Sequence, residues 1–118
     1  PGVAEGVISV GAIGLKDGGY AVAPFSNTQP RVVGPGVAIR SAQKGGGVVA
    51  HSGTSMATPH VAGVAALWAQ KMIEETGAVK ARELEARVVG TGSKKHMAAP
   101  IDHGDLGSGL VQAPEERL

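Results

Sequence analysis

Short apolar runs separated by glycine-rich turns characterise the first part of the chain. Residues 7–13 (Val-Ile-Ser-Val-Gly-Ala-Ile) are mostly apolar and β-branched and are bounded by glycines. This pattern predicts a central strand that is buried on both faces. Residues 14–27 are rich in turn formers, and a second extended segment is expected at residues 31–33, before Pro35-Gly36 turns the chain.

A hairpin is predicted in the next part of the chain. Residues 37–41 alternate weakly between apolar and polar, and residues 48–50 can return as their partner, with Gly45-Gly46-Gly47 in the connecting loop. A glycine triplet can also belong to a phosphate-binding loop. Here it lacks the Gly-Lys-Ser/Thr ending and the helix that follows such a loop, so we interpret it as a plain turn.

The longest helical pattern spans residues 54–75. Alanine, valine, leucine and tryptophan occupy many positions through Ala69, before Gln70, Lys71, Glu74 and Glu75 appear, so the helix is apolar all round at its start and is expected to be buried there. Pro59 is compatible with this helix because it falls in the opening turn, where backbone N–H groups have no intrahelical acceptor. Gly77 is the predicted stop.

A second, shorter helix is predicted over residues 78–89. Leu84 and Val88 fall on one face, while Glu83 and Arg87 are spaced to pair on the solvent side. The remaining residues form polar loops by composition, with no internal repeat. We expect no second domain.

Composition narrows the functional classes. The chain has 118 residues, of which 42% are hydrophobic and 18% charged, so it is globular and has room for at most one small domain. The formal net charge of +1 gives no reason to expect a nucleic-acid partner. Cysteine is absent, and the longest apolar run, residues 61–69, is too short to span a membrane. The chain opens on Pro1 with no initiator Met or signal segment, so we expect it to start within a longer protein.

Ser55 is the candidate nucleophile, in the sequence Gly53-Thr54-Ser55-Met56-Ala57. It is placed where a glycine-flanked loop turns into the long helix, so its own N–H belongs to the unpaired donors at the helix start. A serine hydroxyl needs a base to take its proton and fixed donors to stabilise the oxyanion, and the helix start supplies one donor. The same position suits an ordinary N-cap serine, and the local pattern leaves both interpretations open.

Residues 51–67 (His-Ser-Gly-Thr-Ser-Met-Ala-Thr-Pro-His-Val-Ala-Gly-Val-Ala-Ala-Leu) closely resemble the serine motif of the subtilase family. Other segments resemble further blocks of the family, in the family's order. They are Gly2-Val3 with residues 7–12, Phe25-Ser26-Asn27, residues 34–39 and, after the motif, residues 107–113. The resemblance therefore covers nearly the whole chain.

This resemblance implies an α/β fold, namely a partial three-layer subtilisin-like arrangement with a mainly parallel sheet and a buried central helix that starts at the nucleophile. Residues 1–118 are then the C-terminal segment of a subtilase catalytic domain, which is incomplete in this chain. By the same resemblance Ser55 is the nucleophile, Ser55 and Thr54 lie at the oxyanion hole, and Ser52 and Gly53 line the substrate cleft. No metal ligand is assigned and no cofactor is expected, although calcium is common in the family.

The partners that would activate Ser55 are expected outside the chain. Subtilisin orders its triad Asp, His, Ser, so both partners, and the asparagine donor of the oxyanion hole, are expected upstream of Pro1. His60 belongs to the family motif and is interpreted as structural. His51 is expected on the loop or strand that leads to the helix.

Two further histidines, His103 and His96, have polar or charged neighbours. His103 lies in Asp102-His103-Gly104-Asp105, which allows a metal site or a triad role, but its polar and glycine content favours an exposed loop. His96, beside Lys94 and Lys95, is interpreted as part of a solvated basic patch rather than an anion site. None of these is expected to complete the triad.

Two functions follow as hypotheses. The first is a serine endopeptidase segment that supplies the nucleophile for hydrolysis of a peptide or protein substrate through an acyl-enzyme. The second is an inactive structural or interaction fragment that folds with a partner, such as the N-terminal part of the domain, or as a homo-oligomer. A serine esterase of the α/β-hydrolase type is set aside because the second glycine of its Gly-x-Ser-x-Gly elbow is absent after Ser55. No membrane partner is expected, and an extracellular location is favoured by the resemblance alone.

Overall fold

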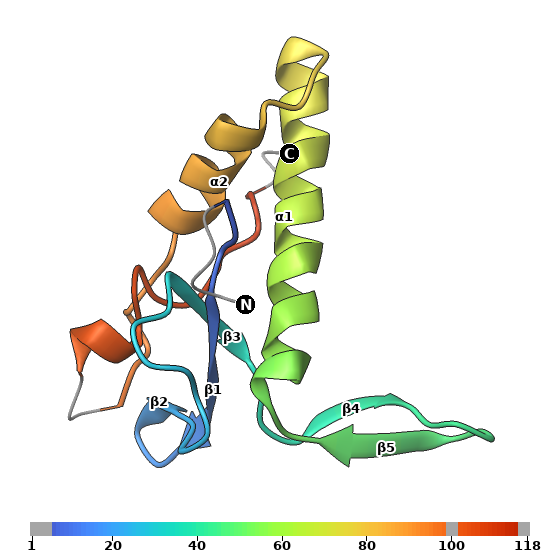
Figure 1. The fold of residues 1–118 in the computed structure, drawn as a ribbon, viewed down its shortest axis with the longest axis vertical. Coiled ribbons are helices and arrows are strands. Elements are labelled where there is room, and N and C mark those ends of the chain that lie inside the picture. Colours follow the sequence, from blue (N-terminus) through green and yellow to red (C-terminus); the bar gives the residue numbers. More distant parts are fainter. Residues whose placement is uncertain (1–5, 99–101, 116–118) are drawn as a thin grey trace.

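The computed structural model describes residues 6–98 and 102–115, so the Gly2-Val3 block lies outside the described residues (Figure 1). The chain combines helices with strands, which confirms the expected α/β class. In chain order its elements are β1 (Val10–Lys16), β2 (Gly19–Val22), β3 (Val32–Pro35), β4 (Ile39–Ala42), β5 (Val48–His51), α1 (Thr54–Thr76), α2 (Ala81–Gly90) and a 3₁₀ turn, η1 (His103–Asp105).

The main sheet has three strands in the order β2-β1-β3, so the predicted central strand is indeed in the middle. β1 and β3 are parallel, with Val10 opposite Val32, whereas β1 and β2 are antiparallel, with Ile13 opposite Val22. The expectation of a mainly parallel sheet is therefore wrong for the described residues, where the sheet is mixed. The reason is β2, which follows β1 through the two-residue turn Asp17-Gly18 and can only return antiparallel.

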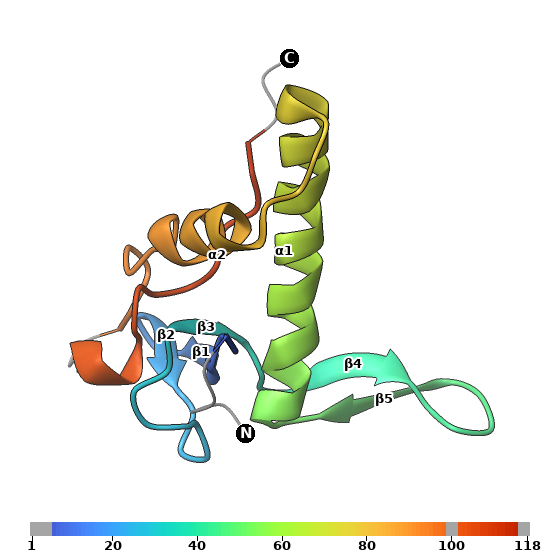
Figure 2. The same cartoon turned by 45° about the horizontal axis from the view of Figure 1, so that its top comes forward.

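Both faces of this sheet are covered by other parts of the chain. On one face the small and β-branched side chains of β1 and β3 pack against α1 and α2, and Figure 2 shows these helices above the strands. The residues in this cluster include Val10, Ala12, Val32, Ala57, Val61 and Val88. On the opposite face Ile13 and Val33 pack against Leu106, which follows η1. β1 is thus buried on both faces, as its unbroken apolar sequence predicts.

The first residues of β1 extend past the end of β2, and side chains rather than a strand form hydrogen bonds with their backbone there. Ser26 Oγ accepts a hydrogen bond from the Ala12 N–H at 3.0 Å, and Asn27 Nδ2 donates to the Val10 carbonyl at 3.0 Å. These contacts satisfy backbone groups that a neighbouring strand would otherwise pair. The Phe25-Ser26-Asn27 block therefore has a structural role that its sequence did not reveal.

Gly77 ends α1 as predicted. It adopts a left-handed conformation with φ of 81°, and its N–H donates to the Ile73 carbonyl at 2.8 Å. Only glycine reaches this conformation without a steric cost from Cβ, and the contact satisfies one of the last carbonyls of the helix.

α2 starts three residues later than expected, but its faces are as predicted. Val88 is buried, and Leu84 packs against the same core cluster. Arg87 pairs with Glu83 at 3.4 Å, the expected spacing of four residues, and also with Glu75 of α1 at 3.0 Å. These exposed ion pairs join the two helices without burying charge.

α1 departs from its expected burial. Its buried residues are Ala57, Val61 and Met72, and of these Ala57 and Val61 pack in the core cluster formed with the sheet and α2. The opposite side, which is equally apolar in sequence, is exposed, with Leu67 at 52% and Ile73 at 47% of full exposure. Within the described structure, the prediction that this helix is buried at its start therefore holds for one side only, because the sheet and α2 both lie on that side (Figure 1).

β4 and β5 form a separate antiparallel hairpin, as predicted, and it projects away from the rest of the chain (Figures 1 and 2). Ile39 pairs with His51 at the base of the hairpin. Gly45, Gly46 and Gly47 all have positive φ angles, of 89°, 118° and 77°, at its tip. The glycine triplet therefore serves as a turn, because it takes backbone angles that other residues rarely adopt.

Candidate active site

Ser55 lies in the first turn of α1 and is exposed. The N-cap residue is Gly53, whose carbonyl accepts hydrogen bonds from the N–H groups of Met56 at 3.0 Å and Ala57 at 3.3 Å. No side chain caps this helix, so the hydroxyl of Ser55 is not used as an N-cap. Within residues 6–98 and 102–115, no acceptor is found for the N–H of Thr54 or of Ser55. Two free donors at the positive end of a helix therefore lie next to the hydroxyl.

Two glycines, Gly34 and Gly36, allow the start of α1 to lie close to the end of β3. A Cβ on Gly36 would lie 2.6 Å from Ala12 Cβ and 2.8 Å from the Gly53 carbonyl oxygen, and a Cβ on Gly34 would lie 3.0 Å from the Ala57 carbonyl oxygen. The Gly53 N–H also donates to the Gly36 carbonyl at 2.8 Å. The loop before Ser55 is thus anchored at the carboxyl end of a parallel strand, where α/β proteins place their ligand sites.

Ser52 also holds the loop before Ser55 in place, through a hydrogen bond to the turn between β3 and β4. Its Oγ accepts a hydrogen bond from the Ala38 N–H at 2.8 Å, across the turn between β3 and β4. Ala38 itself has a positive φ of 52°, which a residue with a Cβ adopts only at some steric cost. Ser52 therefore has a structural contact, while the substrate role given to Ser52 and Gly53 by the resemblance stays a prediction.

Two histidines, His51 and His60, lie close in sequence to the loop before Ser55. His60 Nδ1 lies 2.8 Å from the Met56 carbonyl oxygen within α1, and His51 ends β5 as an exposed residue. Among the hydrogen bonds of the described residues, none joins the Ser55 hydroxyl to an imidazole or a carboxylate. The expectation that the triad partners of Ser55 lie upstream of Pro1 stays a prediction.

The other two histidines neighbour Met97 and Leu106, which pack on the face of the sheet away from α1. His103 Nδ1 lies 3.0 Å from Lys94 Nζ, in an exposed contact. The main-chain carbonyl of His96 accepts a hydrogen bond from Tyr20 of β2 at 2.8 Å. Asp102 accepts a hydrogen bond from the Gly104 N–H at 2.9 Å, which makes the predicted exposed loop a capped 3₁₀ turn.

A groove of about 280 Å³ lies beside the start of α1. Its walls come from β4 and from the first two turns of the helix, and its lining residues are Ile39, Arg40, Ser41, Met56, Pro59 and His60. Met56 of this lining directly follows Ser55 in the first turn of α1, but Ser55 itself is not among the lining residues.

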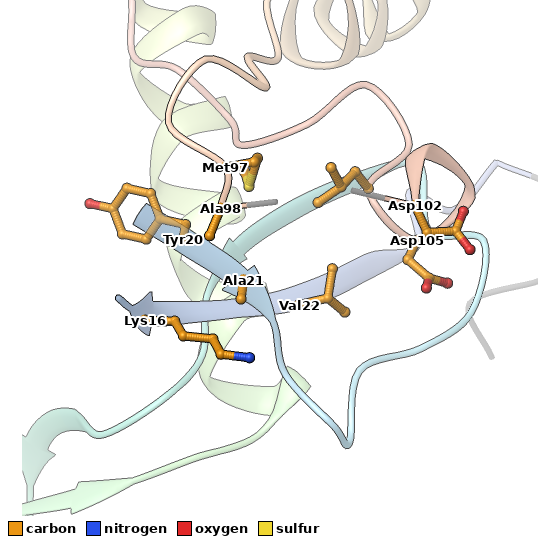
Figure 3. Close-up of a pocket in the computed structure, with 9 residues that line it drawn as sticks. Lys16, Tyr20, Ala21, Val22, Met97, Ala98, Asp102 and Asp105 are labelled. Carbon is orange, nitrogen blue, oxygen red and sulfur yellow. The ribbon is translucent and has the colours of Figure 1, made fainter. Parts of the chain in front are cut away.

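A second cavity, of about 230 Å³, lies between β2 and η1 and contains no residue of α1 (Figure 3). Lys16 lies on its β1 side, and Asp102 and Asp105 lie on its η1 side. Across the described ranges, no three side chains of His, Cys, Asp or Glu are close enough together to hold a metal ion. Nor does any helix in the same ranges have the length and hydropathy to cross a membrane.

Sequence reasoning missed the residues that position Ser55. The sequence predicts only a turn at Pro35-Gly36 and a weakly alternating segment over residues 37–41, whereas the close contacts of Gly34, Gly36 and Ala38 with the helix start and its preceding loop depend on the fold. The available signal was the Gly-Pro-Gly sequence at 34–36, within a block that already resembled the family.

Comparison with known proteins decides the family. A sequence profile of the Subtilase family matches residues 1–109. The chain belongs to the subtilase family. Subtilisin from Bacillus pumilus is 42% identical over 84 residues, which are 70% of this chain and 30% of that protein. The thermophilic serine proteinase of Bacillus sp. (strain AK1) is 49% identical over 73 residues, 60% of this chain and 18% of that protein.

Two solved protease structures are similar to the fold of this chain. The patellamide maturation protease PatA matches with a TM-score of 0.79 and 29% identity, over 95% of this chain and 42% of that chain. Fervidolysin from Fervidobacterium pennivorans, a keratinolytic enzyme related to subtilisin, matches with a TM-score of 0.72 and 29% identity, over 91% of this chain and 18% of that chain. This subtilase chain thus spans less than half the length of these relatives.

Proposed function

We propose that Ser55 is the nucleophile of a serine endopeptidase and that residues 1–118 are the C-terminal segment of its catalytic domain. The observation that carries this proposal is the exposed hydroxyl in the family's serine motif, next to the free N–H groups of Ser55 and Thr54. The substrate is a peptide or a protein, in keeping with the family. Ser52 and Gly53 would line the substrate cleft.

The proposed reaction is acyl transfer. The Ser55 Oγ–H bond breaks as Oγ attacks the scissile carbonyl carbon, and the proton passes to a histidine base supplied by polypeptide outside the described residues. The oxyanion accepts hydrogen bonds from the N–H groups at the helix start, where the helix dipole also favours negative charge. The base then protonates the leaving amine, and water hydrolyses the ester on Ser55 to restore the hydroxyl.

Several finer statements belong to the same proposal. The complete domain would have the three-layer subtilisin-like fold, with the uncovered side of α1 inside it. The reaction itself uses no cofactor. Calcium, which the family resemblance allows, has no group of three acidic or histidine side chains to hold it among the residues that the structure describes. The extracellular location favoured by the resemblance is also part of this proposal.

The test supplies the base and reads out Ser55 directly. A chimera would carry this chain in place of the matching segment of Bacillus pumilus subtilisin and would be treated with a fluorophosphonate probe that labels activated serines. We expect rapid labelling that Ser55→Ala abolishes and that Thr28→Ala, which removes an exposed hydroxyl in the loop before β3, preserves. A chimera that folds by circular dichroism and is not labelled would contradict the proposal.

A second function is favoured by one observation, the exposed apolar side of α1. On this hypothesis the 118-residue chain is an inactive interaction module that folds with a partner or as a homo-oligomer. It predicts that the chimera binds neither probe nor peptide, although it folds. The labelling experiment therefore separates the two functions.

A further inference from the structure

The cavity between β2 and η1 is separate from the region of Ser55. Its volume is about 230 Å³, and none of its described lining residues belongs to α1 or to the β4–β5 hairpin (Figure 3). The reaction proposed at Ser55 therefore does not use it. By a water molecule's share of liquid volume, the cavity has room for about eight waters, so it suits a ligand smaller than a typical drug molecule.

The cavity receives side chains from both faces of the sheet because it lies against β2, the edge strand of the sheet. Tyr20 and Val22 are on the face that packs against Leu106. Alternation along the paired strands places Lys16 and Ala21 on the opposite face. Groups that are far apart in the sequence thus surround one small space.

Charged side chains of opposite sign line this space. Lys16 reaches it from the end of β1, while Asp102 and Asp105 reach it from η1 and the residue before it (Figure 3). The ion pairs found among the described residues all involve Arg31 or Arg87, so Lys16 is paired there with neither carboxylate. The cavity therefore offers an ammonium group on one side and carboxylate oxygens on the other, without an ion pair between them.

Apolar side chains form the surface between these charges. Val22 and Met97 pack in one cluster with Leu106, which is only 2% exposed. An aliphatic group that covers this surface removes apolar area from water, which is favourable. The lining therefore suits a ligand with a charge at each end and an apolar middle.

The strand register gives the length of that ligand. Lys16 follows Ile13 by three positions on β1, and Ile13 lies opposite Val22 in the cluster that contains Leu106. At about 3.3 Å per residue, the lysine and the other end of the cavity are about 10 Å apart. A peptide extends by at most about 3.5 Å per residue, so two residues with a hydrogen bond at each end match this length.

We propose that this cavity binds a free dipeptide with apolar side chains. Its amino group lies at Asp102 and Asp105, its carboxylate lies at Lys16, and its side chains cover Val22 and Met97. An organic cation alone would leave Lys16 without a partner, and an anion alone would leave the two carboxylates without one. Because Lys16 and Asp102 are exposed, their ion pairs contribute little, and the dissociation constant is about 1 mM. This site does not depend on the reaction at Ser55.

The experiment follows the methyl signals of the three methionines of the 118-residue chain by NMR, after labelling with carbon-13. Met97 lines the cavity, whereas Met72 is fully buried elsewhere and Met56 lies beside Ser55. The probe is leucyl-leucine. We expect the Met97 signal to shift and saturate with a dissociation constant of about 1 mM, while the other two signals stay in place.

Two altered probes and two variants test the charged ends separately. N-acetyl-leucyl-leucine lacks the cation and leucyl-leucinamide lacks the anion, so each should bind about fivefold more weakly than leucyl-leucine. Asp105→Asn should weaken leucyl-leucine by the same factor and leave the acetylated probe unaffected. Lys16→Gln should do the same with leucinamide as the unaffected probe. Asp105 is preferred to Asp102, whose carboxylate also accepts the Gly104 N–H.

The matched controls are Glu74→Gln and Lys80→Gln, which remove exposed charges that do not line the cavity. Both should bind all three probes like the parent chain. A Met97 signal that does not shift, or that shifts without saturation together with Met56, would overturn the proposal. Equal binding of leucyl-leucine by the parent and by either cavity variant would overturn it as well, because the ligand would then not bridge the two charged sides.

Discussion

At the scale of single residues, the position of Ser55 depends on the absence of side chains around it. Gly36 allows the loop at Gly53 to approach β1, and Gly34 allows the first turn of α1 to approach β3. The hydroxyl is therefore held by its backbone, while its own side chain makes no capping contact. A nucleophile needs this combination, since its backbone must be fixed and its oxygen free.

Gly36→Ala tests this close approach. The added Cβ would lie 2.6 Å from Ala12 Cβ and 2.8 Å from the Gly53 carbonyl oxygen, and neither atom can move without shifting the sheet or the Ser55 loop. We expect the free energy of unfolding to fall by about 1–3 kcal/mol in urea titrations. The matched control is Gly90→Ala, which meets no atom within 4 Å and has no positive φ. The control should unfold at the same or a higher urea concentration than the parent, and an equal loss in both variants would contradict this argument.

At the scale of elements, the sequence predicts those that rest on long or strongly marked patterns. The helix at 54–75, its stop at Gly77 and the hairpin around the glycine triplet all appear within a few residues of their predicted bounds. The apolar character of residues 7–13 predicted burial on both faces correctly, although β1 itself starts at Val10 and continues to Lys16. These features depend on residues that are close together in the sequence, so the sequence alone is enough to predict them.

The missed elements depend on contacts distant in sequence. β2 is four residues long and half-buried. The Asp17-Gly18 turn pairs it with β1, and such a turn is a hairpin signal, but within the turn-rich residues 14–27 the sequence predicts no strand. The burial of α1 was overestimated for the same reason. Its sequence is apolar on all sides, but which sides are covered depends on the other elements that are present.

Trp68 of α1 forms a hydrogen bond with the C-terminal segment. Its Nε1–H donates to the main-chain carbonyl of Gln112 at 2.8 Å, and the Val111 N–H donates to the Val33 carbonyl of β3 at 3.1 Å. Trp68→Phe keeps an aromatic ring but removes the donor. We expect a loss of about 1 kcal/mol in unfolding free energy and faster hydrogen exchange at the Val111 amide.

The control for this prediction is Gln112→Ala. The acceptor is a main-chain carbonyl, so this variant keeps the hydrogen bond from Trp68 and should exchange at Val111 like the parent protein. If Gln112→Ala accelerates exchange as much as Trp68→Phe, the segment is held by the Gln112 side chain and the argument is wrong.

At the scale of the whole molecule, the chain divides into a packed body and a projecting part. The sheet β2-β1-β3 has cover on both faces, whereas the β4–β5 hairpin is a two-stranded sheet of its own. Val48 on this hairpin is 57% exposed. An isolated two-stranded hairpin has marginal stability in water, so the hairpin should open more readily than the body.

Limited proteolysis can detect this difference because the hairpin carries Lys44 at its tip, beside three glycines. Trypsin cleaves where the backbone opens, and Lys71 and Arg87 lie within helices that pack on the body. We expect mass spectrometry to show the first cut after Lys44 and Lys44→Gln to slow the initial digestion several-fold. A first cut after Lys71 would show instead that α1 opens before the hairpin. That result is expected if contacts with the sheet and α2, on one side of the helix only, stabilise α1 too weakly.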